Sequence, residues 1–287
     1  MSYTFIYYLR RGTYFGDGER RSSMSEMGSA GAETTPRVVS LAPSSTATLT
    51  AMGAGDCLVG VTAHCDFDAP VVGGWLNPNY DRLAELDPDL VCTSDDLQSE
   101  IRDELRERGY AVYHDEPERL TDVVESFESL GSAVGRPAAG EQLAEASRAR
   151  LETVATRVPS DSDSRPIVYC EEWSDPPMAA GNWVPDAVAA AGGRCPFVKP
   201  GERSREVSRE VVEGAAPDHV VLHLCGHGDR VSPGLFSERG WDVDATVHVL
   251  DDSLLNQPSP NLLDGIEALA DLLHSDSHQH ADTDGGH

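Results

Sequence analysis

Tryptophan is the residue type in this sequence whose placement points most directly to ligand chemistry. All four tryptophans stand in segments typical of loops: Trp75, Trp173, Trp183 and Trp241. Trp75 follows two glycines, and Trp173 and Trp183 lie on either side of a Pro-Pro pair. An indole ring in such a position can lie flat on a planar ligand and bury about 150–250 Å². Contact with a flat ligand is one hypothesis, and anchoring of a loop on the core is the other.

Histidine offers a second kind of chemistry. His64 stands beside Cys65 in a segment typical of a loop. A neutral imidazole there can approach a metal centre or donate a hydrogen bond, and a histidine that only caps its loop is the alternative. His223 and His227 have the i, i+4 spacing of helical metal ligands, but their segment has the pattern of a strand ending in a glycine turn. We therefore expect a structural role for this pair and no metal site.

Catalytic signatures do not occur in the sequence. G-x-S-x-G, the P-loop and G-x-G-x-x-G are all missing, so neither a serine nucleophile nor phosphate binding is indicated. The six cysteines stand singly, without a C-x-x-C pair: Cys57, Cys65, Cys92, Cys170, Cys195 and Cys225. This spacing supports neither a zinc ribbon nor a disulfide framework. We expect reduced thiols and a protein that binds its ligand without a catalytic cofactor.

The chain carries a large excess of acid. Its 287 residues include 49 acidic and 22 basic side chains, which gives a net charge of −27, and Lys199 is the only lysine. Such a charge repels phosphate backbones and anionic headgroups, which argues against nucleic acid and membrane partners. Hydrophobic residues still make up 39%, enough for a core. The balance is typical of halophilic proteins, and we expect marginal stability in dilute buffer.

The amino terminus lacks the order of a secretory signal. Residues 3–9 are apolar but few, and they precede Arg10 and Arg11, whereas a signal has its charges first. No apolar run is long enough to span a bilayer. Residues 1–36 are expected to be a disordered leader or a start codon placed too early. We expect a cytoplasmic location for the sequence as it stands, and an extracytoplasmic one if the start lies further along.

From residue 37 onward, short β-branched segments alternate with helical patterns, which predicts parallel α/β units. Strands are expected at 38–41, 58–61, 90–92, 111–113, 166–170, 219–224 and 246–250. Helices are expected at 45–52, 98–108, 120–134, 137–157, 185–191, 208–214 and 262–273. The segments Leu86-Asp87-Pro88-Asp89 and Ala215-Ala216-Pro217-Asp218 each join a helix to a strand. This likeness indicates a duplicated architecture.

These elements predict an α/β protein with two Rossmann-like lobes joined by a long backbone helix, and a ligand cleft between the lobes. The amino-terminal lobe is expected at 37–136, the linking helix at 137–158 and the carboxyl-terminal lobe at 159–274. Residues 275–287 form a tail rich in histidine and aspartate.

The order of these segments resembles the class III substrate-binding proteins with a helical backbone. This family presents cobalamin, ferric siderophores, haem or metal ions to ABC importers. The resemblance covers about residues 37–274 and is strongest to cobalamin-binding members. It rests on Arg37–Ser44, Leu58–Thr62 with Cys65–Phe67, Asn79–Leu83 leading into Leu86–Val91, Asp175–Pro177 with Gly181, and Ser208–Val212.

The resemblance implies a corrinoid as the bound ligand and no enzymatic activity. A corrin is a broad, flat ring with amide side arms, so its cleft needs aromatic planes and a few polar groups. Trp75 stands where the family has an aromatic residue against the ring, and His64 where it often presents tyrosine or histidine. Trp173 and Trp183 are further candidates, although core and cleft are equally open for Trp183. Trp241 is expected to anchor a loop.

The resemblance also implies an ABC permease dimer as a partner. Asp81 and Glu210 stand at equivalent places in the two lobes, where the family has one carboxylate per lobe that reaches permease arginines. Two exposed anions on one side would let a two-fold partner hold both lobes.

The sequence departs from the family at two positions. Ser94 and Ser204 stand where aromatic residues are expected near the ring, so the pocket is expected to be less aromatic. A ferric siderophore or haem protein of the same fold therefore stays open. So do a cytoplasmic corrinoid carrier and a salvage amidohydrolase that hydrolyses corrinoid amides.

Overall fold

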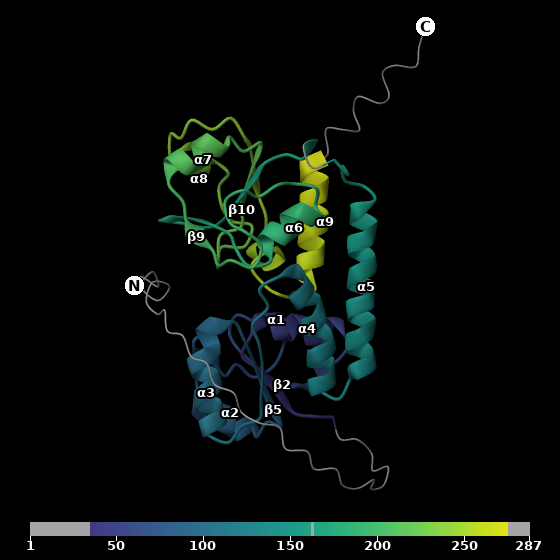
Figure 1. The fold of residues 1–287 in the computed structure, drawn as a ribbon. Helices are drawn as coiled ribbons and strands as arrows, with labels where there is room; N and C mark the ends of the chain where they lie inside the picture. The colour runs from purple at the N-terminus through teal and green to yellow at the C-terminus, as the bar shows by residue number, and fades with distance from the viewer. Residues whose placement is uncertain (1–34, 162–163, 275–287) are drawn as a thin grey trace, which may run out of the picture. The chain divides into compact units, whose positions relative to one another are not determined.

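The first lobe is a parallel sheet with helices on both faces (Figure 1). The computed structural model describes residues 35–161 and 164–274, so the segments 1–34 and 275–287 lie outside it, and with them the expected tail and most of the expected leader. The sheet has the order β2-β1-β5-β6, with β1 (Val38–Ser40), β2 (Leu58–Val61), β5 (Leu90–Ser94) and β6 (Val112–Asp115). Its helices are α1 (Pro43–Ala51), α2 (Tyr80–Leu86) and α3 (Ser99–Glu107). A hairpin of β3 (Gly73–Gly74) and β4 (Asn77–Pro78) precedes α2.

Alternation along the strands explains the two buried faces of this sheet. Val38 packs with Leu49 of α1 on one face, and Val39 packs with Leu83 of α2 and Leu105 of α3 on the other. Successive strand residues point to opposite faces, so a sheet covered on both sides needs apolar residues at consecutive positions. The short apolar runs of the sequence meet this requirement.

The second lobe repeats the parallel core and adds an antiparallel edge. Its strand order is β11-β10-β7-β8-β9, in which β11, β10 and β7 are parallel. The strands are β7 (Val168–Ser174), β8 (Pro177–Ala179), β9 (Arg205–Glu206), β10 (His219–Leu222) and β11 (Thr246–Val249). The helices are α6 (Val184–Ala190), α7 (Arg209–Ala215), α8 (Gly234–Ser237) and α9 (Asn261–His274). The predicted two-lobed α/β fold is thus confirmed.

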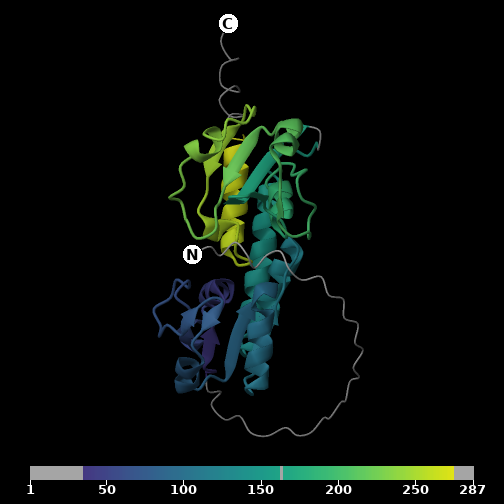
Figure 2. The same ribbon diagram turned by 90° about the vertical axis from the view of Figure 1, so that its left-hand side faces the viewer.

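Two neighbouring helices, α4 (Leu120–Ala133) and α5 (Pro137–Ala155), connect the lobes (Figure 1 and Figure 2). The first half of α4 belongs to the core of the second lobe, where Phe127 shares a cluster with Trp183 and α9. Its end belongs to the first lobe, where Leu130 packs in the cluster of Leu49. The helix that the sequence assigned to the first lobe therefore contributes to both cores. The spacing of apolar residues in α4 shows which side of the helix is buried. It does not show which lobe that side packs against.

A carboxylate of the second lobe fixes the start of α4. Asp186 of α6 accepts hydrogen bonds from Nε and Nη2 of Arg119, at 2.7 and 2.9 Å, and from the backbone N–H of Leu120 at 3.2 Å. A negative charge at the first turn of a helix binds N–H groups that have no partner within the helix. The contact holds the entry of α4 against the second lobe.

The joins before β5 and β10 have the same conformation in the two lobes. Asp87 and Ala216, each followed by proline, end α2 and α7 in the left-handed region, with φ of 44° and 45°. In each lobe, the aspartate after this proline accepts a hydrogen bond from the backbone N–H of the residue that precedes the first strand of the lobe. The two bonds are Arg37 N to Asp89 Oδ2 (2.8 Å) and Ile167 N to Asp218 Oδ2 (2.7 Å). The two joins therefore share one local conformation, in keeping with the likeness of the two sequence segments.

Candidate functional site

Strand ends of the two lobes face one another. Asp96, which follows β5, forms an ion pair with Arg203, which precedes β9, with 2.8 Å between Oδ2 and Nη2. Asp95 lies beside this pair, and its charge acts across the lobes on Glu172 of β7. We call Asp95, Asp96, Glu172, Arg203 and Ser204 the interlobe site.

Glu172 is the titratable group of the second lobe at this site. Burial raises the pKa of Glu172 to about 7; a hydrogen bond from Ser204 opposes the rise, and the charge of Asp95 adds to it. Ser204 Oγ accepts the N–H of Gly181 at 2.9 Å, which leaves its own hydrogen for Glu172. A Cβ at Gly181 would overlap the backbone of the loop that carries Ser204, so the approach requires glycine.

Asp95 stands in a constrained turn of the first lobe. Its φ of 72° lies in a region that favours glycine. Oδ1 of Asp95 accepts the N–H of Leu97 at 2.9 Å, and its carbonyl accepts the N–H of Gln98 at 3.0 Å. Burial raises the pKa of Asp95. Such conformations persist where the surroundings hold them, and here the turn keeps a carboxylate at the interlobe site.

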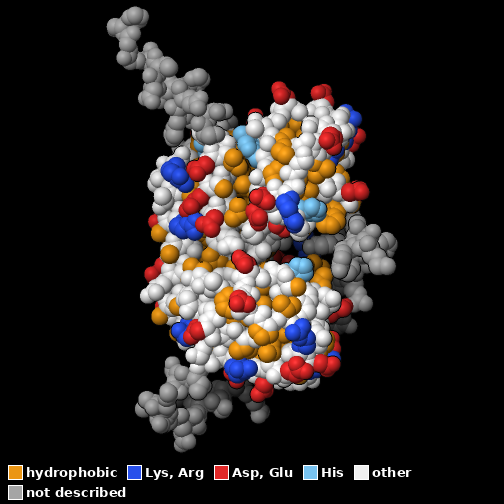
Figure 3. Space-filling view, turned by 180° about the vertical axis from the view of Figure 1, so that it is seen from behind, with side chains coloured by type: hydrophobic (Ala, Val, Ile, Leu, Met, Phe, Trp, Pro, Cys, Tyr) orange, Lys and Arg blue, Asp and Glu red, His pale blue; other side chains and the backbone are white. Residues whose placement is uncertain are grey.

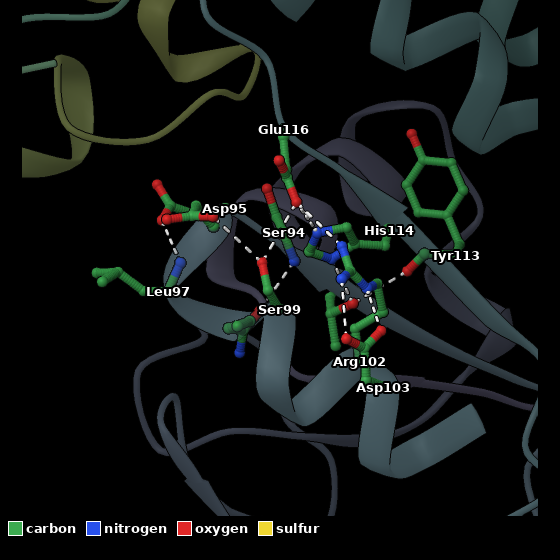
Figure 4. A network of polar contacts seen from close by, with 12 residues as sticks. Ser94, Asp95, Leu97, Ser99, Arg102, Asp103, Tyr113, His114 and Glu116 are labelled. Carbon is green, nitrogen blue, oxygen red and sulfur yellow. Dashed lines mark hydrogen bonds and ion pairs between the residues drawn. The ribbon is translucent and has the colours of Figure 1, made fainter. Parts of the chain in front are cut away.

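A chain of polar side chains continues from Asp95 along the ends of β5 and β6 beside α3 (Figure 4). Oγ1 of Thr93 lies 2.8 Å from Nδ1 of His114, and Nε2 of His114 lies 2.7 Å from Glu116. Glu116 also accepts a hydrogen bond from Arg102 at 3.1 Å. Thr93, His114, Glu116 and Arg102 therefore satisfy one another within the first lobe.

His223 places a buried acceptor at the end of β10. The register of β10 and β7 ends with Leu222 paired to Glu171, and the N–H of His223 donates to the carbonyl of Glu171 at 3.0 Å. Asn256 donates through Nδ2 to the carbonyl of His223 at 2.9 Å, so its Oδ1 accepts the N–H at Nδ1 of His223. Nε2 then carries a lone pair, and no described residue donates to it. Burial lowers the pKa of His223 to about 4, which keeps the ring neutral.

Trp75 is tied to the same strand end by Gln98. It stands between β3 and β4, partly exposed, and its carbonyl accepts a hydrogen bond from Gln98 Nε2 at 2.7 Å. The same amide group donates to Leu41 at 3.1 Å, and its Oε1 accepts the N–H of Ser94 at 2.9 Å. The buried amide thus holds the tryptophan loop next to the residue that precedes Asp95.

The other predicted ligand contacts lie in different environments. Trp173 is partly exposed near the end of β7, and its indole N–H donates to the carbonyl of Asp175 at 2.9 Å. His64 is exposed in the turn after β2. Trp183 is only 5% exposed, and its N–H donates to the carbonyl of Leu255 at 2.8 Å. The structure therefore corrects the assignment of Trp183, whose ring packs in the core and has little surface to offer a ligand.

Trp241 packs beside a loop helix, as expected. Its ring lies edge-on to Phe236 of α8 at 5.6 Å, and the guanidinium of Arg239 lies 5.2 Å from the ring centre. His223 and His227 also take structural positions, with Nδ1 of His227 2.9 Å from the carbonyl of Cys225. All six cysteines are described and none forms a disulfide. In the described ranges, no group of three or more metal-ligating side chains is gathered.

Asp81 and Glu210 occupy the same position in α2 and α7. Both side chains are exposed in the first turn of their helix. Asn79 caps the Asp81 helix by accepting the N–H of Arg82 at 3.1 Å, and Ser208 caps the Glu210 helix. Hydrogen bonds from its own backbone and from Ser208 lower the pKa of Glu210, which keeps this carboxylate ionised.

Sequence reasoning did not select Asp95, Glu172 and Arg203. The available signal is their position, because Asp95 directly follows β5 and Glu172 lies in the last half of β7, near the strand ends where α/β proteins bind ligands. With 49 acidic residues in the chain, residue type alone could not single them out.

Comparison with known proteins decides the class of protein. Residues 38–246 match the family described as periplasmic binding protein. The chain belongs to this family. Its members are solute-binding proteins and not enzymes, which agrees with the prediction of a binding protein. A periplasmic family does not support the expected cytoplasmic location. Across the described ranges, no helix combines the length and apolar character needed to cross a membrane.

Relatives and solved structures agree with this assignment. The vitamin B12-binding protein of Vibrio cholerae is 26% identical over 255 residues, covering 83% of this chain and 88% of that protein. The cobalamin-binding protein of Halobacterium salinarum is 27% identical over 256 residues, covering 83% and 69%. Among solved structures, the periplasmic vitamin B12-binding protein BtuF of Vibrio cholerae has a TM-score of 0.68 at 23% identity, covering 85% and 98%. The haem-binding protein HutB of Vibrio cholerae has a TM-score of 0.71 at 17% identity, covering 84% and 100%.

Proposed function

We propose that this protein binds a corrinoid between its two lobes and delivers it to an ABC importer. The observation that carries the proposal is the alignment of most of the chain with proteins named for vitamin B12 and cobalamin, in a bacterium and in Halobacterium. The facing strand ends of the two lobes supply the place for a ligand. Delivery to an importer of this kind takes place outside the cytoplasm, in keeping with the periplasmic family.

Trp75, Trp173 and His64 are the proposed ligand contacts. Trp75 and Trp173 keep part of their indole surface exposed, one in each lobe, and can cover a flat ring. His64 is exposed after β2 and can donate a hydrogen bond to an amide arm or approach the cobalt. Trp183 is left out of this set because its ring is buried.

An ABC permease dimer is the proposed partner, with Asp81 and Glu210 as its contacts. Their equivalent positions on α2 and α7 give each lobe one exposed carboxylate at a capped helix start. An arginine binds a carboxylate through two parallel hydrogen bonds, which hold at salt concentrations that screen longer-range attraction.

Absorption spectroscopy tests the ligand. The full chain is titrated in concentrated salt with cobalamin, cobinamide, haem and a ferric hydroxamate, and the spectral shift is followed. We expect a saturable shift with the corrinoids at one ligand per chain. A spectrum that moves with haem and stays unchanged with both corrinoids would overturn the corrinoid proposal in favour of the haem protein of the same fold. Formation of a corrinoid carboxylic acid with release of ammonia or an amine on long incubation would indicate the amidohydrolase instead.

A further inference from the structure

Two histidines on neighbouring strands of the second lobe contact each other. Nδ1 of His219, the first residue of β10, lies 3.0 Å from Nε2 of His248 on β11. The rings are nearly parallel, with 26° between their planes and 5.2 Å between their centres. The strand register pairs His248 with Val221, so His219 is the diagonal neighbour of His248 on the same face of the sheet. The sheet itself therefore brings the two imidazole nitrogens together.

The protons of the two rings decide what holds these nitrogens at this distance. A neutral imidazole has one N–H and one lone pair, so one ring donates a hydrogen bond to the other when no ligand is bound. If the donor ring carries its proton on its other nitrogen, two lone pairs face each other and repel. A cation that binds both lone pairs stabilises this second arrangement.

The distance between the nitrogens indicates the kind of cation. A metal–imidazole bond is about 2.0–2.1 Å long. Two such nitrogens lie about 2.8–3.0 Å apart when their bonds meet at a right angle, and about 3.3–3.4 Å apart at the tetrahedral angle. The observed 3.0 Å agrees with the right angle. Nitrogen ligands at right angles are typical of tetragonal copper(II) and nickel(II).

The surroundings of the pair also suit a metal cation. Both histidines are partly exposed and β11 is an edge strand, so water can fill the remaining ligand positions. Burial and the charge of His219 lower the pKa of His248, which keeps this ring neutral at neutral pH, as metal binding requires. The net charge of −27 attracts cations to the chain.

We propose that His219 and His248 form a binding site for one copper(II) or nickel(II) ion, which joins the edge strand β11 to β10. The inference does not depend on the proposed function. His219 is in register with Val168, the first residue of β7, whereas Glu172 of the interlobe site lies in the last half of that strand. The bound ion stabilises the folded chain, because only folding brings the two nitrogens together.

Metal titration of the untagged full chain at about pH 7.5 tests the site. The tail histidines can bind metal by themselves, so the reference protein is His278→Ala/His280→Ala/His287→Ala. We expect it to bind one copper(II) ion, with electron paramagnetic resonance showing two coupled nitrogens, and to melt at a higher temperature with nickel(II). His219→Gln and His248→Gln, each made in this reference protein, should weaken nickel(II) binding about tenfold or more, because the second ligand of a chelate acts at a high effective concentration.

His227→Gln in the same reference protein is the matched control. It removes an exposed histidine outside the pair and should leave nickel(II) affinity unchanged. Affinity is measured with nickel(II) because copper(II) oxidises exposed thiols such as that of Cys225. Melting curves without metal verify that the variants are folded. If a glutamine variant does not fold, the number of nitrogens coupled to copper(II) in the reference protein decides.

Three results would overturn the metal site. The first is the absence of saturable binding to the reference protein, and the second is a copper(II) spectrum with fewer than two coupled nitrogens. The third is a nickel(II) affinity that is the same in the reference protein and in His219→Gln, or that falls equally in His227→Gln. Any of them would leave His219 and His248 as a hydrogen-bonded pair that only links two strands.

Discussion

Trp75 and Trp241 have opposite roles at the scale of single residues. Trp75 is partly exposed on a loop fixed by Gln98, and Trp241 packs edge-on against Phe236. Trp75→Ala should weaken corrinoid binding by about 1–3 kcal/mol and leave the fold intact, since a stacking plane is lost. Trp241→Ala should lower the free energy of unfolding more and affect binding less. Calorimetric titration and urea unfolding of both variants check this, and the reverse ranking would show that the roles are exchanged.

Glu172 makes stability depend on pH. Its pKa in the folded chain is about 7, above the ordinary 4.5, because burial disfavours the charged form. The folded state therefore holds this proton more tightly than the unfolded state, and the stabilising contribution is lost as pH rises from about 4.5 through 7. The difference in unfolding free energy between wild type and Glu172→Gln should change across this window and stay constant above it. A difference that does not vary between acid and neutral pH would contradict the raised pKa.

The sequence shows which tryptophans stand in loops, but it does not show which residues from distant parts of the chain pack against them. The loop positions of Trp75 and Trp241 could be predicted because each of these bulky aromatic residues directly follows glycine, which is typical of loops. Trp183 has a similar local sequence, and its burial depends on Leu255, which lies far along the chain. The same limit applies to the ion pair of Asp96 and Arg203, which exists only once both lobes have formed.

At the scale of elements, α4 and α5 touch through their backbones at two glycines. A Cβ on Gly140 would lie 2.5 Å from the carbonyl oxygen of Phe127, and one on Gly131 would lie 2.8 Å from Cα of Gly140. Gly140→Ala should lower the free energy of unfolding by about 1–3 kcal/mol, because the helices must separate. Urea unfolding measures the loss.

Gly214 of α7 provides the matched control. A Cβ there meets no atom within 4 Å, so Gly214→Ala should be neutral or stabilise by up to about 1 kcal/mol through helix propensity. Equal losses for the two variants would show that the cost at Gly140 does not come from helix contact.

Helices and strands with a clear hydrophobic pattern could be predicted from the sequence. Short strands that form only by pairing with a neighbouring strand could not. The predicted strands and helices of both parallel cores are present to within a few residues. The edge strands β8 and β9 were missed because they are short and contain Pro177 or the charged Arg205–Glu206. Their pairing depends on β7, and no alternation marks them in the sequence.

At the scale of the whole molecule, the charge of −27 predicts a stability that depends on salt. Acidic side chains are spread over the face seen in Figure 3, and most basic side chains on it stand beside acidic ones. The melting temperature should rise as potassium chloride is added. This rise should be nearly complete at about 1 M salt, where the Debye length is about 3 Å. A melting temperature that does not change would contradict self-repulsion, and a linear rise far above that concentration would indicate salting-out instead.

Docking to the permease is the other property of the whole molecule. Asp81→Arg/Glu210→Arg should abolish corrinoid uptake in cells while the affinity of the purified protein for corrinoid is unchanged, because the reversed charges would repel the arginines that the proposed docking requires on the permease. Each single change should give a partial defect. Glu141→Arg/Glu145→Arg on α5 is the control and should import normally. Normal import by the Asp81/Glu210 variant would exclude this pair as the docking contacts.

The shared core around α4 has a consequence for any attempt to divide the molecule. The chain passes between the lobes before α4, along α4 and along α5, and both helices bury apolar side chains among those of α6 and α9. A chain cut between Pro159 and Ser160 would therefore not release two independent domains. The first fragment would display the apolar face of α4, the second would display the surface of α6 and α9 that covers it, and the two would reassemble as complementary halves of one folding unit.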